Sequence, residues 1–361
     1  MKNNKPAYLI LYEQLRTAII DGVFPYETRL PSKRTLASEF DLSLITVEHA
    51  LALLEEEGYI EPKERSGSFV SYRREDVLPV NEEHFLNPVE YTAPKSSFPY
   101  SVISRTIRRV LSDYQEEILK KSPPCGLLML QEAIASYLFT SRGISVSPRQ
   151  IIIGSGAEYL YGLIVQTLGR NLTYGIENPS YQTIRRIYEA NDVKIDLLKL
   201  GNNGILSGEL KRTRADVLHI TPFRSFPTGI SADASKRREY IAWARKRKAM
   251  IIEDDYDSEF TLSGKPADTL LALSNGDCVI YLSTFSTTIA PSIRIGYMIL
   301  PVHLLSAFEE KAGFYSCTVS TFSQLILYEL ISSGDYARNV NRMRRERRRN
   351  ASSRQNRESC S

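Results

Sequence analysis

Hydrophobic positions in the first seventy residues follow helical spacing in three short stretches. The apolar side chains of 8–22 share one helical face, and serines suited to cap helix N-termini precede two further stretches, at Ser32 and Ser43. Two strand-like runs follow, with a turn at 63–67 between them. Three helices followed by a two-stranded wing predict a winged helix-turn-helix unit over residues 1–75.

The hydrophobic pattern of the rest of the chain differs. Residues 76–95 mix charges with prolines and show no sustained period, which predicts a linker. Beyond it, two amphipathic helices precede short apolar runs that alternate with helical stretches, at 150–153, 173–176, 193–200, 217–221, 249–253 and 278–283. This alternation predicts an α/β domain over 96–337, with a mostly parallel sheet covered on both faces. Such sheets bind ligands at the carboxyl ends of their strands.

Three polar motifs follow predicted strands. The run GSGAE at 154–158 closes a strand and opens a helix, which suits a phosphate, although a plain tight turn is the commoner meaning of two such glycines. Tyr181 follows a turn, where a lone tyrosine most often only packs. An acidic cluster, 253–257, follows an apolar strand and indicates a ligand site, with a solvated loop as the alternative.

The net charge of +4 is unevenly distributed. Residues 338–361 hold nine arginines and two glutamates, a local charge of +7, so the rest of the chain sums to −3. A surface for nucleic acid must therefore be found locally. The sequence contains no run long enough to cross a membrane and no signal pattern, so we expect a cytoplasmic protein. The four cysteines and four histidines are dispersed, so we predict no metal site.

The N-terminal unit resembles the DNA-binding domain of the GntR family. The resemblance is carried by LPSKRTLA at 30–37, by TV at 46–47 and by GY at 58–59 before the wing. It implies that the third helix enters the major groove of double-stranded operator DNA. The residues that it implies as DNA contacts, the last of them at the wing tip, are Arg29, Ser32, Arg34, Thr46 and Gly67.

Two positions depart from the GntR pattern. Leu44 stands where the family usually has an arginine, and Glu27 replaces a glycine usual in the preceding turn. Because arginine on guanine is the commonest specific contact, Leu44 predicts a weaker or altered sequence preference. A module that contacts proteins, or one that no longer binds DNA, remains the alternative.

The larger domain resembles the aminotransferase-like domain of fold-type-I pyridoxal 5'-phosphate (PLP) proteins. The matching text is YLFTSRG at 137–143, TPFRSFPTG at 221–229, AWA at 242–244 and EDDYDSEF at 253–260. Its pairing with a GntR-like head resembles the MocR group of bacterial transcription regulators.

The resemblance assigns roles toward the cofactor to particular residues. Tyr181 would stack on the pyridine ring, Asp254 would accept a hydrogen bond from its N–H, and Tyr256 would bond the phenolic oxygen. A phosphate cup would be formed by Ser155, Gly156, Ala157, Ser286 and Arg294.

Thr287 occupies the position at which the family carries its Schiff-base lysine. A hydroxyl cannot condense with an aldehyde, so we predict no catalytic residue and, at best, non-covalent PLP binding. The nearest lysines in sequence, Lys265 and Lys311, lie in no matching motif.

Residues 338–361 show no apolar period and are expected to be a disordered basic tail. The resemblance implies a further segment that completes the small domain and carries an arginine for a substrate carboxylate, so we expect an incomplete small domain. We favour an interrupted or shifted reading frame as the origin of this tail; the alternative is an arginine tail that binds nucleic acid.

The sequence therefore predicts a DNA-binding transcription regulator with an aminotransferase-like domain that senses PLP or an amino-acid-like effector. The family architecture implies a homodimer on two half-sites of operator DNA. Two alternatives stay open. One is a PLP-dependent aminotransferase with a regulatory head, and the other is a degraded regulator that binds no ligand.

Overall fold

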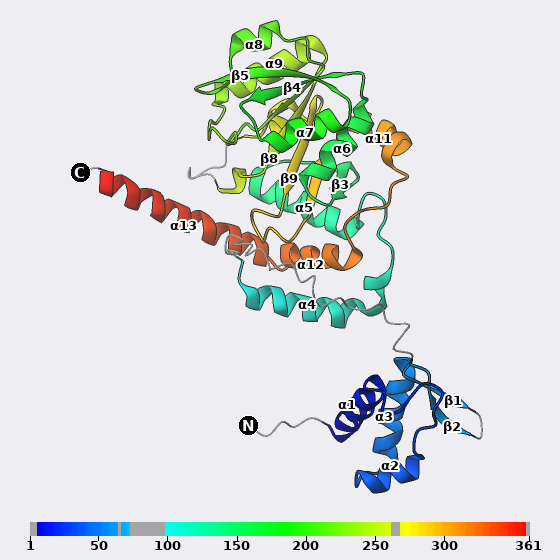
Figure 1. Ribbon diagram of the computed structural model, residues 1–361. Coiled ribbons are helices and arrows are strands. Elements are labelled where there is room, and N and C mark those ends of the chain that lie inside the picture. The colour runs from blue at the N-terminus through cyan, green and yellow to red at the C-terminus, as the bar shows by residue number, and fades with distance from the viewer. Residues whose placement is uncertain (1–5, 64–65, 73–97, 261–267, 359–361) are drawn as a thin grey trace. The chain divides into compact units, whose positions relative to one another are not determined.

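The computed structural model describes residues 6–63, 66–72, 98–260 and 268–358 (Figure 1). The chain divides into two compact units, Met1–Tyr91 and Thr92–Ser361. The expected linker, 76–95, lies outside the described residues. No helix among the described residues is long and apolar enough to span a membrane.

The N-terminal unit is a winged helix-turn-helix, as predicted. Its helices and strands are α1 (Ala7–Ile20), α2 (Lys33–Glu39), α3 (Leu44–Glu56), β1 (Ile60–Lys63) and β2 (Gly67–Val70). The two strands pair antiparallel, and one apolar cluster includes side chains from every element. Both predicted caps form: Ser32 Oγ accepts from the Thr35 amide at 3.1 Å, and Ser43 Oγ accepts from the Thr46 amide at 3.2 Å.

The larger unit is built on an eight-stranded sheet in the order β3-β10-β9-β8-β7-β4-β5-β6. The strands are β3 (Ile151–Gly154), β4 (Thr173–Asn178), β5 (Lys194–Gly201), β6 (Gly204–Ile205), β7 (Val217–Ile220), β8 (Met250–Asp255), β9 (Val279–Thr284) and β10 (Gly296–Ile299). Strands β5, β4, β7, β8 and β9 are parallel, which confirms the predicted α/β class. The pattern did not predict β10, a short antiparallel strand between β3 and β9.

Helices cover both faces of this sheet (Figure 1). The α-helices described in this unit are α4 (Tyr100–Tyr114), α5 (Leu128–Arg142), α6 (Ala157–Leu168), α7 (Gln182–Ala190), α8 (Ser207–Arg212), α9 (Ala234–Arg247), α10 (Leu270–Ser274), α11 (Leu305–Ala312), α12 (Thr321–Ser332) and α13 (Asp335–Glu358), of which α4 and α13 pack against α12 rather than on the sheet. Alternate strand residues supply two apolar cores. Ile153 packs in the cluster that contains α5 and α9, and Ile152 packs in the cluster that contains α6 and α7.

The expectation of a disordered tail from residue 338 is wrong for the part that the structure describes. Helix α13 begins at Asp335 and continues to Glu358. Tyr336, Val340 and Met343 are buried at helical spacing on one face. Arginine is also a good helix former, and Arg344 pairs with Glu259 at 2.9 Å. Three apolar positions among many arginines were too sparse a signal to reveal this helix from the sequence.

Candidate functional site

A cavity of about 320 Å³ opens where β8 and β9 end and α6 begins. It brings together eight of the residues predicted for the cofactor site and the Schiff-base position: Gly156, Ala157, Tyr181, Asp254, Tyr256, Ser286, Thr287 and Arg294. Ser155 does not line it. That residue lines a neighbouring, largely apolar cavity of about 510 Å³, and its amide already donates to Thr318 Oγ1 at 3.1 Å.

Asp254 is held at the floor of this cavity by one of its two oxygens. Its side chain is 4% exposed, and Tyr161 donates a hydrogen bond to Oδ2. His219 Nε2 lies 3.5 Å from the same oxygen. The other oxygen, Oδ1, has no hydrogen-bond partner among the described residues. A buried acceptor without a partner is costly, so Oδ1 is an acceptor available to a ligand.

The hydroxyl of Tyr161 remains a donor over the ordinary pH range. Burial raises its pKa well above the usual value, and the adjacent Asp254 carboxylate raises it further. This role could not be predicted from the sequence, because Tyr161 sits in the middle of an apolar helix, 93 positions away from its partner.

Thr287 is exposed at the cavity and lies beside the backbone of Tyr256. Its Oγ1 donates to the Tyr256 carbonyl oxygen at 3.0 Å, so the hydroxyl is partnered but remains able to accept. The Tyr256 hydroxyl in turn donates to the Arg224 carbonyl oxygen at 2.6 Å, and burial raises the pKa of Tyr256 to about 12. No lysine is among the described residues that line this cavity.

The predicted phosphate cup converges on Gly156 and Arg294. Gly156 is the N-cap of α6 with φ of 91°, and a Cβ added there would lie 3.3 Å from Arg294 Nη2. Ser286 lines the cavity, with its hydroxyl donating to the Ile293 carbonyl oxygen at 2.8 Å. Glu158, which sequence reasoning missed, pairs with Arg294 at 2.7 Å. The glutamate was visible at the end of the GSGAE run, but its partner was not.

Two aromatic rings lie at the cavity. Tyr181 is 41% exposed and meets Phe226 edge to face, with ring centroids 6.0 Å apart. The tyrosine was predicted and the phenylalanine was not. Together they supply an aromatic wall to a site that also contains charged side chains.

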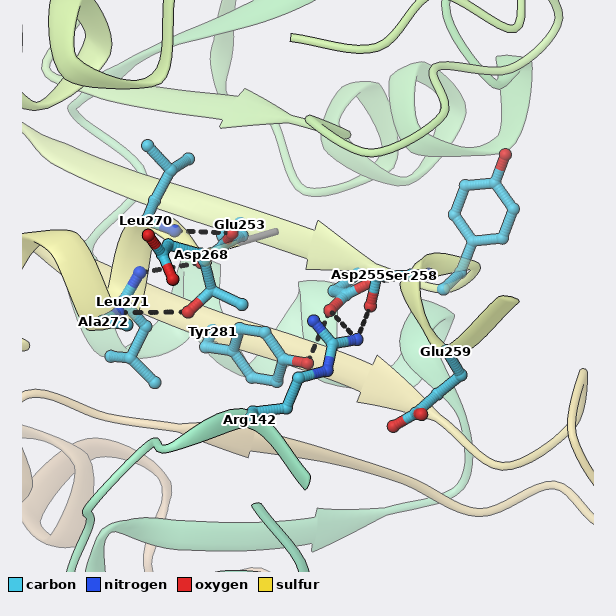
Figure 2. A network of polar contacts seen from close by, with 12 residues as sticks. Arg142, Glu253, Asp255, Ser258, Glu259, Asp268, Leu270, Leu271, Ala272 and Tyr281 are labelled. Atoms are coloured by element: carbon cyan, nitrogen blue, oxygen red, sulfur yellow. Dashed lines mark hydrogen bonds and ion pairs between the residues drawn. The ribbon is translucent and has the colours of Figure 1, made fainter. Parts of the chain in front are cut away.

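The acidic cluster 253–257 is largely a structural network rather than a solvated loop (Figure 2). Asp255 is buried against Arg142, with Nη2 and Oδ2 3.5 Å apart, and also accepts from the Tyr281 hydroxyl at 2.7 Å. Glu253 accepts from the amides of Leu270 and Leu271, at 2.8 and 2.9 Å. Burial, and then the charge of Asp255, raise the pKa of Glu253 to about 8. Of the three consecutive acids, only Asp254 lines the cavity.

The residues predicted to contact DNA fall into two groups. Arg29 and Arg34 are exposed cations. Arg29 packs on Gly67, and a Cβ added to Gly67 would lie 3.0 Å from the Nε of Arg29. Ser32 is exposed and Thr46 partly buried, and both are engaged in N-terminal caps, of α2 and α3 respectively. Glu27 has φ of 63°, which explains why a glycine suits that turn.

The start of α3 presents apolar rather than basic side chains. Leu44 is 47% exposed and Ile45 is 78% exposed. No acidic residue lies in the first turn of this helix. The first turn of this helix therefore carries no acidic side chain to repel a phosphate, but also no guanidinium for a base edge at Leu44.

The fold and the site together define a chain that joins a winged-helix unit of DNA-binding type to an aminotransferase domain. The sequence matches the gntR family of bacterial regulatory proteins over residues 7–70, and aminotransferase class I and II over residues 90–356. The chain belongs to the gntR-type regulators that carry an aminotransferase class I and II domain.

Curated relatives share this arrangement over most of their length. The chain is 35% identical over 353 residues to an uncharacterized HTH-type transcriptional regulator, YdeL, of Bacillus subtilis, covering 94% of this chain and 76% of the relative. It is 31% identical to the HTH-type pyridoxine biosynthesis transcriptional regulator PdxR of Corynebacterium glutamicum, covering 93% and 75%. It is 27% identical to the probable rhizopine catabolism regulatory protein MocR of Rhizobium meliloti, covering 94% and 74%.

Among solved structures, the kynurenine aminotransferase of Pyrococcus horikoshii superposes with a TM-score of 0.63 at 24% identity. The match covers 69% of this chain and 64% of the aminotransferase, which is less than two thirds of that enzyme's length. This likeness establishes the fold of the larger unit.

Proposed function

We propose that this transcription regulator binds a PLP-type ligand non-covalently in its aminotransferase domain and couples that binding to operator recognition. The observation that carries the proposal is the cavity itself. It keeps the cation of Arg294 and a buried oxygen of Asp254 that has no partner within the described part of the chain, and it presents Thr287 where an amine would be needed.

Apart from the absent lysine, most of the residues expected to hold PLP line the cavity. Asp254 Oδ1 would accept from the ring N–H, and Arg294 with the N-terminus of α6 would hold the phosphate. Tyr181 would pack on the ring. When bound, the cofactor supplies an electron-withdrawing ring bearing an aldehyde.

The chain's own residues favour binding over catalysis. Tyr161 fixes Asp254 so that one oxygen stays available, and Thr287 can only donate or accept a hydrogen bond. Amino-group transfer on this fold uses a lysine amine to shuttle the proton and release the product. The aminotransferase alternative therefore has no support from the cavity, whereas a ligand that enters and leaves reversibly suits a sensor.

The operator would be bound through the N-terminal unit. Arg29 and Arg34 would contact the DNA backbone, α3 would lie in the major groove with Thr46 at its first turn, and Gly67 would let the wing approach the minor groove. A homodimer would place two such units on two half-sites, and an amino-acid-like effector would be a second occupant of the cavity.

Equilibrium dialysis with PLP, followed by borohydride reduction and peptide mass spectrometry, tests the ligand claim. We expect reversible binding that Asp254→Ala abolishes and no reduced adduct on any peptide that lines the cavity. A failure to bind, or a stoichiometric adduct at this cavity, would contradict the proposal. Fluorescence anisotropy with DNA from the gene's own upstream region tests the second claim, for which we expect a complex that weakens steeply with salt.

A further inference from the structure

A carboxylate lies inside the cup that would hold the ligand's phosphate. Glu158 Oε2 is 2.7 Å from Arg294 Nη2, and both side chains line the 320 Å³ cavity. Glu158 belongs to the first turn of α6, where the helix dipole also attracts an anion. Glu158 thus pairs with the cation of the cup, and it lies on the helix turn whose dipole would also attract the phosphate.

We infer that Glu158 is a built-in competitor for the phosphate of the ligand, and that it sets the preference of the cavity between phosphorylated and unphosphorylated ligands. This inference rests on the proposed function. A phosphate that pairs with Arg294 must either displace Glu158 from that guanidinium or share the guanidinium with its carboxylate. The affinity for phosphorylated ligands is therefore lower than the cup would otherwise provide, and their exchange is faster.

The alternative role for Glu158 is to hold Arg294 in place and so to help the phosphate bind. The solvent exposure of Glu158 and Arg294 decides between these two roles of Glu158. The side chains of Glu158 and Arg294 are 41% and 55% exposed, and an ion pair this exposed contributes little to order. The same exposure screens repulsion, but a phosphate dianion carries twice the charge of a carboxylate and would share its guanidinium, so its repulsion by Glu158 is the larger effect.

The charge balance of the cavity supports this conclusion. Among the described residues that line it, the charged ones are Glu158, Asp254 and Arg294, a formal sum of −1. Replacing Glu158 with glutamine brings the sum to zero and leaves Arg294 unopposed in the cup. A lysine at residue 287 would have supplied the missing positive charge, and Thr287 does not.

Isothermal titration calorimetry of the full chain can test the inference with two probes, pyridoxine 5'-phosphate and pyridoxine. Neither carries an aldehyde, so surface lysines do not interfere. We expect Glu158→Gln to tighten pyridoxine 5'-phosphate binding about tenfold, or ~1.4 kcal/mol, and to change pyridoxine binding less than about twofold. Glu158→Asp keeps the charge on a shorter side chain and should give a gain below about threefold.

Glu189→Gln on α7 is the matched control. Glu189 pairs with Arg185 at 2.7 Å with similar exposure, but it does not line the cavity. It should leave both affinities unchanged. If wild type binds pyridoxine 5'-phosphate and Glu158→Gln binds it equally or more weakly, the inference is overturned while the proposed function stands. An equal gain for both probes also overturns it. If no variant binds either probe, the inference and the proposed ligand fail together.

Discussion

Tyr161 donates to one oxygen of Asp254 and leaves the other oxygen of the same carboxylate without a partner among the described residues. The two residues come from α6 and β8, and both elements contribute side chains to one apolar core. The hydrogen bond therefore fixes which oxygen faces the ligand. Tyr161 is therefore a positioning residue, because its hydroxyl donates its hydrogen bond to the aspartate rather than to a ligand.

Substituting Tyr161 with phenylalanine should both destabilise the protein and weaken the ligand site. Removing a hydrogen bond to a buried carboxylate costs about 1–3 kcal/mol, because Oδ2 keeps only His219 at 3.5 Å. Urea unfolding measures this cost, and calorimetry with pyridoxine 5'-phosphate should show weaker binding. Tyr174→Phe is the matched control. Its hydroxyl donates to the neutral Gly169 carbonyl at 3.3 Å, so it should cost at most about 1 kcal/mol and leave binding intact.

The buried Glu253 predicts a pH dependence of stability. Its pKa in the folded state is raised to about 8, above the ordinary value of 4.5, so between these values the folded chain holds a proton that the unfolded chain releases. The contribution of Glu253 to stability is therefore complete below pH 4.5 and is lost as pH rises toward 8. The free energy of unfolding should fall by up to ~1.4 kcal/mol per pH unit in this window.

Urea titrations at several pH values between 5 and 8 check this prediction, with Glu253→Gln as the reference. The variant cannot titrate at this position, so its unfolding free energy should decline less across the window than that of the wild type. Other groups titrate alike in both proteins and cancel in the comparison. Parallel curves for the two proteins would mean that Glu253 is ionised in the folded state.

The sequence was sufficient to predict most of the helices and strands, and also the site residues that belong to a recognisable motif. Ser32 and Ser43 predicted two helix starts because a cap needs only a local hydroxyl and a free amide. The alternation of apolar runs and helices predicted the parallel sheet. Asp254 was found because it sits in the matching run 253–260, and the resemblance also assigned Arg294 to the phosphate cup; the structure brings both to one cavity.

Contacts between distant residues could not be predicted. Glu158 and Arg294 are 136 positions apart, and only the folded sheet places the start of α6 beside the segment that precedes β10. The acidic cluster shows the same limit. Its neighbouring carboxylates look alike in sequence, but burial against Arg142 and α10 directs two of them away from the ligand site.

At the DNA-binding unit, Leu44→Arg should restore a base contact. Leu44 is the first residue of α3 and is 47% exposed, so an arginine would fit without disturbing the core. A guanidinium paired with guanine contributes about 1–3 kcal/mol of discrimination against other bases. Anisotropy with a panel of operator variants, at one salt concentration, should therefore show a new guanine preference.

Arg34→Ala provides the contrast within the same unit. Arg34 is exposed on α2 and is expected to contact phosphate. Its loss should therefore weaken binding to all DNA sequences alike and reduce the salt dependence of binding by about one counterion. If Leu44→Arg raised the affinity for every DNA sequence equally, residue 44 would contact the DNA backbone, and its assignment to a base contact would be incorrect.

Thr287→Lys should convert the reversible site into a covalent one without creating an aminotransferase. The threonine is exposed at the cavity, so a longer side chain has room, and its amine can condense with PLP. Borohydride reduction should then trap about one cofactor per chain on the peptide that contains residue 287. Thr287→Met, similar in length but without an amine, should give no adduct there.

Amino-group transfer should remain absent in the lysine variant. Arg294 is the one arginine among the described residues that line the cavity, and it is needed for the phosphate. An amino-acid substrate would therefore find no second guanidinium for its carboxylate. Incubating the variant with PLP and a panel of amino acids, and following keto-acid formation, measures this directly. Sustained turnover would show that the cavity holds a substrate carboxylate by other means, and would return the aminotransferase alternative to consideration.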